Sequence, residues 1–337
     1  MTDLSWRGRL YEKIVTHSDF DGIVSAAICA SVLKVDHVVF AGPLTIARSQ
    51  LSITEKDVVC DLPYPLVCGL WFDHHEGNLH ELAYRKIDPK SIPGRFDLKA
   101  SCSRVVHEYF SESIELSPHF AGIVAEADRI DGFSYASMEE WREETAGKVI
   151  DLTLKSRFSS SQEQTTYMRN LFHLLKDRPL EEISRLPWVV KRLEQYREEE
   201  ARMLRMIRES SYFLDEDPGR ELVVVDLTPH ARRPHLIKNL AFVIYPEALA
   251  VVEVYNLTSQ GVKSNDLGFS MSLSIEANKR APAKNIGEIM RSLNIGDGHP
   301  GAAAGIVRCR SKAEMLRKKK EILSQLFRIW STQHGEK

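Results

Sequence analysis

The sequence predicts an α/β protein of two domains: an N-terminal domain with a mostly parallel sheet and flanking helices, and a smaller C-terminal α/β domain after a helical linker. Its 337 residues exceed what one hydrophobic core comfortably holds. From residue 13 to about 110, short β-branched runs alternate with helical stretches, which is typical of stacked βαβ units. A long helical stretch then separates these units from a second group of strands.

The first domain is expected at residues 1–185. Its strands are predicted from short apolar runs at residues 13–16, 37–41, 57–60, 70–72 and 83–87. The first helix should begin near Gly22, because small and apolar residues from Ile23 onward share one helical face. Ser117 and Pro118 predict the start of a later helix, as its N-cap and its first helical residue.

The linker is expected at residues 186–214 and the second domain at residues 215–337. Residues 138–213 have an almost wholly helical pattern, which indicates one long helix over 186–212. The pattern returns to strands at 221–227, 249–255 and 269–275, with helices at 286–293 and 312–330. The second domain is therefore predicted to be a separate α/β unit.

Composition narrows the class of protein. Lys and Arg total 45 against 47 for Asp and Glu, which lacks the basic excess of a protein that binds long nucleic acids. Five cysteines without a C-x-x-C pair favour reduced thiols over a disulfide framework or a thiolate zinc site. Neither a signal peptide nor an apolar run of roughly 20 residues is found. We therefore expect a cytoplasmic protein with no membrane partner.

Polar side chains follow the first predicted strand. His17, Asp19 and Asp21 are spaced two apart, so on an extended backbone they point to one side. Ligands of open α/β sheets gather beyond the carboxyl ends of the strands. An imidazole with two carboxylates makes a hard, mixed nitrogen and oxygen site for a cation. The alternative is that Asp19 or Asp21 only caps the following helix.

Two further strands end in the same kind of residue. Asp61 ends a buried apolar strand, where a lone carboxylate is costly unless its charge is compensated. The alternative is that Asp61 is only a turn residue before Pro63. Asp73, His74 and His75 end the next strand, and two adjacent rings can serve a metal and a substrate. Solvated loop histidines are the alternative. Three such strand ends together indicate a metal site.

The motifs Thr-His-Ser-Asp-Phe-Asp-Gly at 16–22, Asp61 and Asp-His-His at 73–75 resemble the first three motifs of the DHH phosphoesterase superfamily. That superfamily includes RecJ-like exonucleases, nanoRNase-like enzymes and exopolyphosphatase-related proteins. Asp128 resembles its fourth motif, a lone Asp on a later helix, with Asp131 one turn further as the reserve. Residues 296–305 resemble the Gly-Gly-Gly-His motif of the DHH-associated domain, with Asp297 in place of a usual glycine.

The resemblance implies two divalent cations, Mn²⁺ before Mg²⁺ or Co²⁺. It assigns one cation to His17, Asp19 and Asp61, and the other to Asp21, Asp61, His74 and Asp128. Asp73 would orient a histidine, and His75 would contact phosphate or transfer a proton. The resemblance assigns substrate contacts to Gly296, Gly298 and His299. The arginine of the family's Ser-Arg-Ser element has no match at 271–274, so it is either missing or supplied by Arg280 or Lys284.

The predicted function is hydrolysis of a phosphodiester or phosphomonoester in a short nucleotide-type substrate, such as a short oligonucleotide or a 3′,5′-bisphosphate nucleotide. A polyphosphate or pyrophosphate hydrolase is the alternative enzyme, and a nucleotide-binding module is the alternative without catalysis. RNA, DNA and signalling nucleotides stay open as substrates. A homodimer is left open as well.

Overall fold

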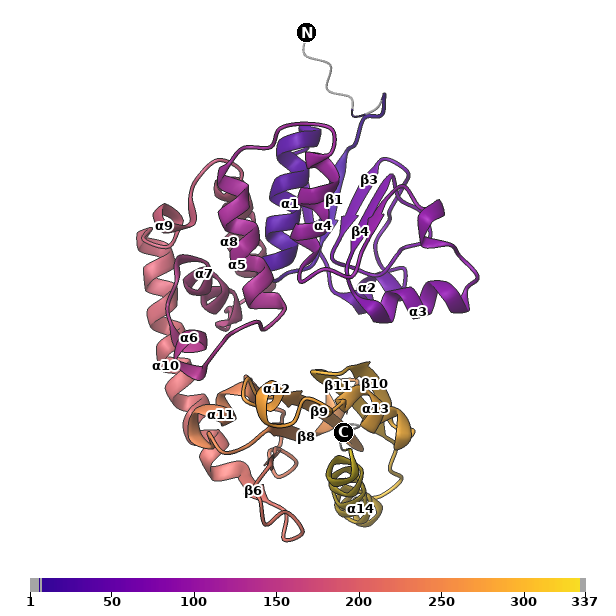
Figure 1. Cartoon of the computed structure of the whole chain (residues 1–337), viewed down its shortest axis with the longest axis vertical. Helices are drawn as coiled ribbons and strands as arrows, with labels where there is room; N and C mark the ends of the chain where they lie inside the picture. Colours follow the sequence, from indigo (N-terminus) through magenta and orange to yellow (C-terminus); the bar gives the residue numbers. More distant parts are fainter. Residues whose placement is uncertain (1–5, 7, 334–337) are drawn as a thin grey trace. The chain divides into compact units, whose positions relative to one another are not determined.

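The computed structural model describes residue 6 and residues 8–333, apart from the side chain of Asn278. The chain divides into two compact units. The first contains the chain up to Tyr135 together with Arg142–Arg197, and the second contains Ala136–Trp141 and the chain from Glu198 onward. Each unit carries its own sheet, which confirms the predicted two-domain α/β class (Figure 1). The finer bounds expected at 185 and 214 stay a prediction.

The first unit is built on a five-stranded parallel sheet in the order β2-β1-β3-β4-β5. Its strands are β1 (Lys13–Thr16), β2 (Val38–Phe40), β3 (Asp57–Cys60), β4 (Leu70–Asp73) and β5 (Gly94–Phe96). The chain adds β2 on one side of β1 and β3 on the other. Such a reversal of strand order is where open α/β sheets bind ligands, at the carboxyl ends of the strands.

The strand predicted at 83–87 is wrong. The helix α3 (Glu76–Tyr84) occupies the start of that segment, and the fifth strand, β5, comes later. Leu82 on α3 and Ile87 after it both pack into the core beneath the sheet. A short apolar run does not distinguish a strand from the end of a helix, because either can bury it.

Helix α1 (Phe20–Leu33) is buried on nearly every side, in keeping with its small and apolar sequence. It contacts β1 and β3 of the sheet, and it also packs against α4 (Cys102–Ser111), α5 (His119–Asp131) and α8 (Ser161–Leu175). The first unit also contains the short helices α2 (Pro43–Ala47) and α9 (Leu180–Ile183), and α7 (Ala146–Lys155). The start of α1 is thereby fixed against β1.

The region 138–213 is mostly helical, as predicted. It contains α6 (Met138–Arg142), α7, α8, α9 and the long α10 (Pro187–Ser210), which contributes to both units. Residues after Ser210 depart from the prediction, because β6 (Ser211–Phe213) pairs with the next strand. In the part of the chain that the structure describes, no helix combines the length and apolarity needed to cross a membrane.

The second unit contains a mixed sheet in the order β10-β11-β9-β8-β7-β6. Its further strands are β7 (Leu222–Asp226), β8 (Ala250–Ser259), β9 (Val262–Leu273), β10 (Gly296–His299) and β11 (Ala302–Val307). The pair β7 and β8 is parallel and the other pairs are antiparallel. Its helices are α11 (Ala241–Ile244), α12 (Ala277–Arg280), α13 (Ile286–Ser292) and α14 (Lys312–Thr332), and residues of α13 and α14 complete the core.

Candidate metal centre

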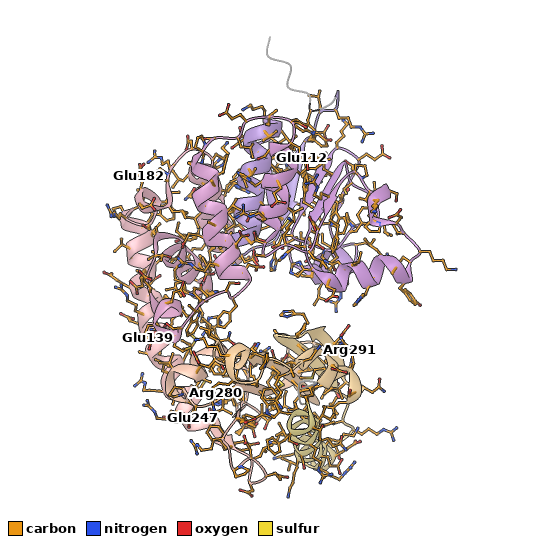
Figure 2. The ribbon with its side chains drawn as sticks, in the orientation of Figure 1. Glu112, Glu139, Glu182, Glu247, Arg280 and Arg291 are labelled. Atoms are coloured by element: carbon orange, nitrogen blue, oxygen red, sulfur yellow. The ribbon has the colours of Figure 1, made fainter. Side chains whose placement is uncertain are left out.

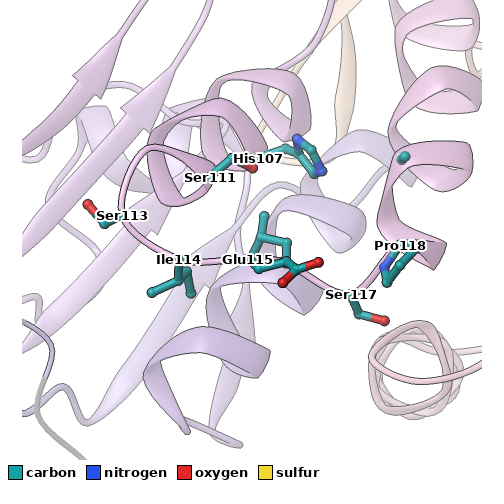
Figure 3. A pocket seen from close by; sticks show the side chains of 9 residues that line it. His107, Ser111, Ser113, Ile114, Glu115, Ser117 and Pro118 are labelled. Carbon is teal, nitrogen blue, oxygen red and sulfur yellow. The ribbon is translucent and has the colours of Figure 1, made fainter.

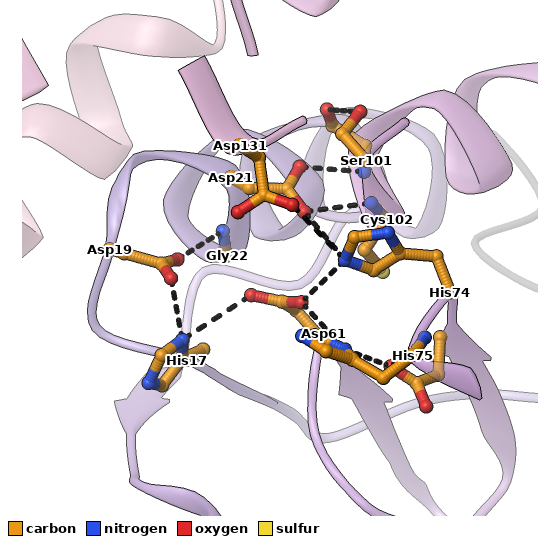
Figure 4. Close-up of polar contacts among 12 residues, drawn as sticks. His17, Asp19, Asp21, Gly22, Asp61, His74, His75, Ser101, Cys102 and Asp131 are labelled. Atoms are coloured by element: carbon orange, nitrogen blue, oxygen red, sulfur yellow. Dashed lines mark hydrogen bonds and ion pairs between the residues drawn. The ribbon is translucent and has the colours of Figure 1, made fainter. Parts of the chain in front are cut away.

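The turn between β1 and α1 places His17 and Asp19 against each other. Nδ1 of His17 lies 2.6 Å from Oδ2 of Asp19, while Oδ1 of Asp19 accepts a hydrogen bond of 2.9 Å from the Gly22 amide (Figure 4). Asp19 therefore caps α1 and also reaches the histidine with its second oxygen. A Cβ at Gly22 would lie 2.5 Å from the His17 carbonyl oxygen, so glycine is needed for this close approach.

Asp61 lies among three histidines, His17, His74 and His75. Its backbone leaves β3 in the left-handed region, with φ of 57°, which Asp tolerates better than most residues. Its buried carboxylate then places Oδ2 3.5 Å from Nδ1 of His17 and Oδ1 3.6 Å from Nε2 of His74. Oδ2 thus faces His17, while Oδ1 faces His74 and also lies 3.7 Å from Nδ1 of His75 (Figure 4).

The amino end of α4 holds Asp21. The Cys102 amide donates to Oδ2 of Asp21 at 2.7 Å, and the Ser103 amide donates to Oδ1 at 2.9 Å. Ser101 is the N-cap of this helix, so the free amides after it meet a carboxylate, as helix N-termini favour. Asp21 is buried and its orientation is fixed before any ligand binds.

His74 lies beside Asp21 and Asp61. Its Nδ1 lies 3.1 Å from the Lys99 carbonyl oxygen, which orients Nε2 toward three carboxylates. Nε2 is 3.3 Å from Asp131, 3.6 Å from Asp61 and 3.9 Å from Asp21.

The structure brings Asp131, not Asp128, to the cluster. Asp128 accepts hydrogen bonds from Nε of Arg104 at 2.9 Å and from Oγ of Ser101 at 2.7 Å. Its carboxylate is therefore already neutralised by a guanidinium. The reserve residue Asp131, one turn further along α5, is thus the one that lies near His74 and Asp21, and which of the two residues binds a metal stays a prediction.

Asp73 and His75 form a pair beside the cluster. Oδ1 of the fully buried Asp73 lies 2.9 Å from Nδ1 of His75, and Oδ2 accepts a hydrogen bond of 2.6 Å from Asn78. The His75 side chain is 51% exposed, in contrast to 9% for His74. Of the two adjacent rings, His74 thus faces the buried carboxylates and His75 is held at the surface.

The donor set fits divalent cations. Three groups have ligand atoms within 4.8 Å of one another: His17 with Asp19 and Asp61, Asp21 with His74 and Asp131, and Asp61 with His74 and His75. Nε2 of His74 and Oδ1 of Asp61 are buried without a hydrogen-bond partner among the described residues. Buried polar atoms normally have partners, so these two atoms are suited to contact with a bound cation. Carboxylates with imidazoles suit Mn²⁺, Mg²⁺ or Co²⁺.

The charges within the cluster also favour a bound cation. Burial, together with the charges of Asp61 and Asp131, raises the pKa of Asp21 well above its usual value. Burial also raises the pKa of Asp131 to about 6, and His74 opposes this shift. Burial lowers the pKa of His17, but contacts with Asp19 and Asp61 outweigh it and raise the pKa to about 10. Crowded carboxylates attract a positive charge to this place.

The predicted substrate residues Gly296, Gly298 and His299 lie in the second unit. They belong to β10, which pairs with β11 in a hairpin. A Cβ at Gly296 would lie 1.9 Å from the Ala304 carbonyl oxygen, so the glycine allows close strand packing. The unusual Asp297 accepts from the Gly298 amide at 2.8 Å and pairs with Arg291. The segment is therefore an ordered hairpin, and its role in substrate binding stays a prediction.

Arg280 ends α12 and donates to the Glu247 carbonyl oxygen at 3.1 Å, and the two residues lie side by side in Figure 2. It lines a cavity of about 500 Å³ that also contains Lys284, whose ammonium lies 4.7 Å from the Trp330 ring centre. His299 does not line this cavity. Arg280 thus lines this cavity without His299, and a substrate role for Arg280 also stays a prediction.

A larger hollow of about 640 Å³ lies in the first unit between the end of α4 and the start of α5 (Figure 3). His107, Ser111 and Glu115 are among its lining residues. None of the predicted metal residues lines it, so cavity size and the predicted metal residues point to different places in this unit.

Sequence reasoning missed the residues that orient the predicted site carboxylates. Asn78 binds Asp73 and Arg104 binds Asp128, and neither lies in a recognisable motif. The Ser-Cys-Ser sequence at 101–103 did carry a signal, because a helix N-cap predicts free amides nearby. Their carboxylate partner, Asp21, lies some 80 residues earlier, and only the folded chain shows that contact.

No protein-family model and no curated protein matches the chain. Solved structures do match it. The pGpG-specific phosphodiesterase PggH from Vibrio cholerae aligns with a TM-score of 0.68 and 23% identity, over 94% of this chain and 99% of that one. A structure described as a DHH domain aligns with a TM-score of 0.54 and 12% identity, over 98% of this chain and 88% of that one.

RecJ from Thermus thermophilus, solved with Mn²⁺, aligns with a TM-score of 0.53 and 16% identity, over 96% of this chain. The alignment spans 53% of that RecJ, so the present chain corresponds to about half of its length. The chain therefore has the two-domain fold of the DHH superfamily. Within that class, its likeness to the pGpG-specific phosphodiesterase extends over nearly the whole of both chains.

Proposed function

We propose that this chain is a two-metal phosphoesterase that hydrolyses a phosphodiester or phosphomonoester in a short nucleotide-type substrate. The observation that carries the proposal is the position of Asp61, whose Oδ2 faces His17 while its Oδ1 faces His74 and His75. A carboxylate in that position can be shared by two cations, and its unpartnered Oδ1 supports this role.

One cation would be held by His17, Asp19 and Asp61, and the other by Asp21, Asp61, His74 and Asp131. Mn²⁺ is proposed first, with Mg²⁺ or Co²⁺ as alternatives. When bound, such a pair of cations supplies an activated water and neutralises charge on the phosphoryl oxygens. The amides of α4 fix Asp21 in place, and the Lys99 carbonyl group fixes His74.

His75 is proposed as the catalytic residue that exchanges a proton with the substrate. Asp73 accepts the Nδ1 proton of His75, which leaves Nε2 of the exposed ring to face the substrate. Asn78 fixes the other oxygen of the buried Asp73, so the orientation of the ring depends on both residues. Asp73 acts through His75 and is therefore a positioning residue.

A short nucleotide is supported by two observations. The fold matches a pGpG-specific phosphodiesterase over nearly its whole length. The chain also has a net charge of −2, which does not favour a long polyanion. We therefore propose a dinucleotide or another short oligonucleotide as the first substrate class, and a 3′,5′-bisphosphate nucleotide as the second. A cytoplasmic location and a homodimer stay predictions.

The test is a substrate panel with the full chain in Mn²⁺ and in EDTA. The panel contains pGpG, other dinucleotides, RNA and DNA pentamers, adenosine 3′,5′-bisphosphate, pyrophosphate and polyphosphate. We expect Mn²⁺-dependent hydrolysis of a short nucleotide. Phosphate release from inorganic chains alone would replace the nucleotide proposal by the polyphosphatase alternative. Nucleotide binding without Mn²⁺ uptake or turnover would show a binding module.

The matched pair of variants is Asp61→Asn and Asp36→Asn. Asp36 precedes β2 at the opposite edge of the sheet and pairs with Lys176 at the surface. Both substitutions remove one carboxylate charge. Only Asp61→Asn is expected to abolish turnover, and an active Asp61→Asn variant would exclude the two-metal assignment.

A further inference from the structure

A basic hollow lies in the second unit, apart from every predicted site residue. It has a volume of about 410 Å³ and lies between the loop after β7 and the turn of the β8–β9 hairpin. The strand β7 ends at Asp226, opposite Val254, whereas β8 continues to Ser259. The hollow forms where the longer hairpin extends past its neighbour.

Cationic side chains dominate its lining. Arg232, Arg233 and Lys263 line the hollow, and no carboxylate is among the described residues that do. Arg233 is fixed by Glu253 at 2.8 Å and lies 3.4 Å from the centre of the Tyr255 ring. Glu253 balances the charge of Arg233, so Arg232 and Lys263 supply the positive charge of the hollow.

The other two cations differ in how they are held. Lys263 donates to the carbonyl oxygens of Thr228 at 2.7 Å and of His230 at 2.8 Å, which joins the loop to the hairpin. Arg232 is exposed, and within the described part of the chain its guanidinium has no ion-pair or hydrogen-bond partner. A fixed wall and a free guanidinium are suited to an anion.

Asn256 gives an independent indication of a ligand. It lines the hollow, it is only 7% exposed, and its Nδ2 donates to the Ser264 carbonyl oxygen at 3.0 Å. That bond fixes the orientation of the amide, and Oδ1 is left buried without a hydrogen-bond partner among the described residues. A buried acceptor without a donor is costly, so a ligand with an N–H or O–H group would relieve it.

We infer that this hollow binds a small phosphate-bearing molecule that also carries an N–H or O–H donor, as a nucleoside monophosphate does. The phosphate pairs with Arg232 beside Lys263, and Asn256 accepts from the donor. The volume lies within the range of small-molecule sites.

The hollow lies at the other end of β9 from the predicted substrate residues. Lys263 and Leu273 are separated by roughly 33 Å along β9, since a strand rises about 3.3 Å per residue. Leu273 bonds Gly301 near His299, so the hollow is distinct from the β10–β11 hairpin.

The test uses the full-length Asp61→Asn protein in EDTA, so that neither hydrolysis nor bound metal affects the result. Isothermal titration with inorganic phosphate and with GMP measures binding. We expect both to bind, GMP about fivefold more tightly because it can satisfy Asn256. Absence of GMP binding would overturn the inference and would leave the proposed hydrolysis unaffected.

Two variants locate the binding. Arg232→Glu is expected to weaken both ligands at least about tenfold, whereas Arg310→Glu, an exposed arginine of the same unit outside the hollow, leaves both unchanged. Asn256→Ala is expected to remove the preference for GMP over phosphate. Equal losses in both arginine variants, or full binding in Arg232→Glu with an unchanged melting temperature, would place the ligand elsewhere.

Discussion

At the scale of single residues, the cluster depends on carboxylates that each perform two tasks. Asp19 caps α1 and contacts His17, and Asp61 turns the chain in the left-handed region while facing three rings. These residues are explicable as a cap and a turn when each is considered alone. The structure shows that the local roles and the cluster coexist, because each carboxylate has two oxygens.

The left-handed backbone at Asp61 predicts different stabilities for two substitutions. Asp61→Gly accepts φ of 57° without a Cβ, whereas Asp61→Ala keeps the strain and should be less stable by about 1 kcal/mol. Denaturant unfolding in EDTA measures the difference. Both variants should be inactive. An Asp61→Ala variant as stable as Asp61→Gly would show that the backbone there is not strained.

Asp128 and Asp131 differ in their partners and should differ in activity. Arg104 already neutralises Asp128, while Asp131 faces Nε2 of His74. Asp131→Asn is expected to lower kcat/KM by about 100-fold or more, as loss of a metal ligand or its support does. Asp128→Asn should retain activity within a few-fold. The reverse order in a kinetic comparison would restore the original assignment of Asp128.

Metal binding should release protons. Contacts with carboxylates hold the pKa of His17 and of His74 at about 10 despite burial, so both rings are protonated at pH 7.5 in the metal-free chain. A metal takes neutral imidazole and ionised carboxylate, so at least about two protons per chain should be released, and the raised pKa of Asp21 adds to this number. Titration with Mn²⁺ in two buffers of different ionisation enthalpy measures this number. Heats that do not depend on the buffer would contradict it.

At the scale of elements, the beginnings of two helices position Asp21 and His17, two of the proposed metal ligands. The amides of α4 hold Asp21, and the first turn of α1 lies against the loop that carries His17. The N-cap role of Ser101 could be predicted from the sequence. Its contact with a carboxylate from the β1–α1 loop could not, because the two segments meet only through folding.

Gly22 tests the approach of α1 to this loop. A Cβ at Gly22 would lie 2.5 Å from the His17 carbonyl oxygen, whereas one at Gly122 on α5 would meet nothing within 4 Å. Gly22→Ala should lose about 1–3 kcal/mol of unfolding free energy and also weaken Mn²⁺ binding. Gly122→Ala is expected to gain up to about 1 kcal/mol, since alanine favours helix. Chemical denaturation of both variants checks the pair, and equal effects would refute the packing argument.

At the scale of the whole molecule, the sequence allowed prediction of the fold class and of the strand ends at which the structure brings His17, Asp61 and His74 together. Strands β1 and β3 were placed within their observed bounds, because buried parallel strands are short apolar runs. The segment at 83–87 was assigned wrongly, since a helix end can be equally apolar. Asp128 and Asp131 are one turn apart, and helical periodicity alone does not tell which of them Arg104 binds.

The central claim is that Asp61 is shared between two cations in one centre. It is tested most directly by Mn²⁺ stoichiometry, measured by equilibrium titration of the wild-type chain and of Asp61→Asn, with Asp36→Asn as the control. We predict two Mn²⁺ per wild-type and control chain, and affinities weakened by about 10-fold to 100-fold at both positions in Asp61→Asn. Two Mn²⁺ bound with unchanged affinity in Asp61→Asn, or none bound to the wild type, would contradict the claim.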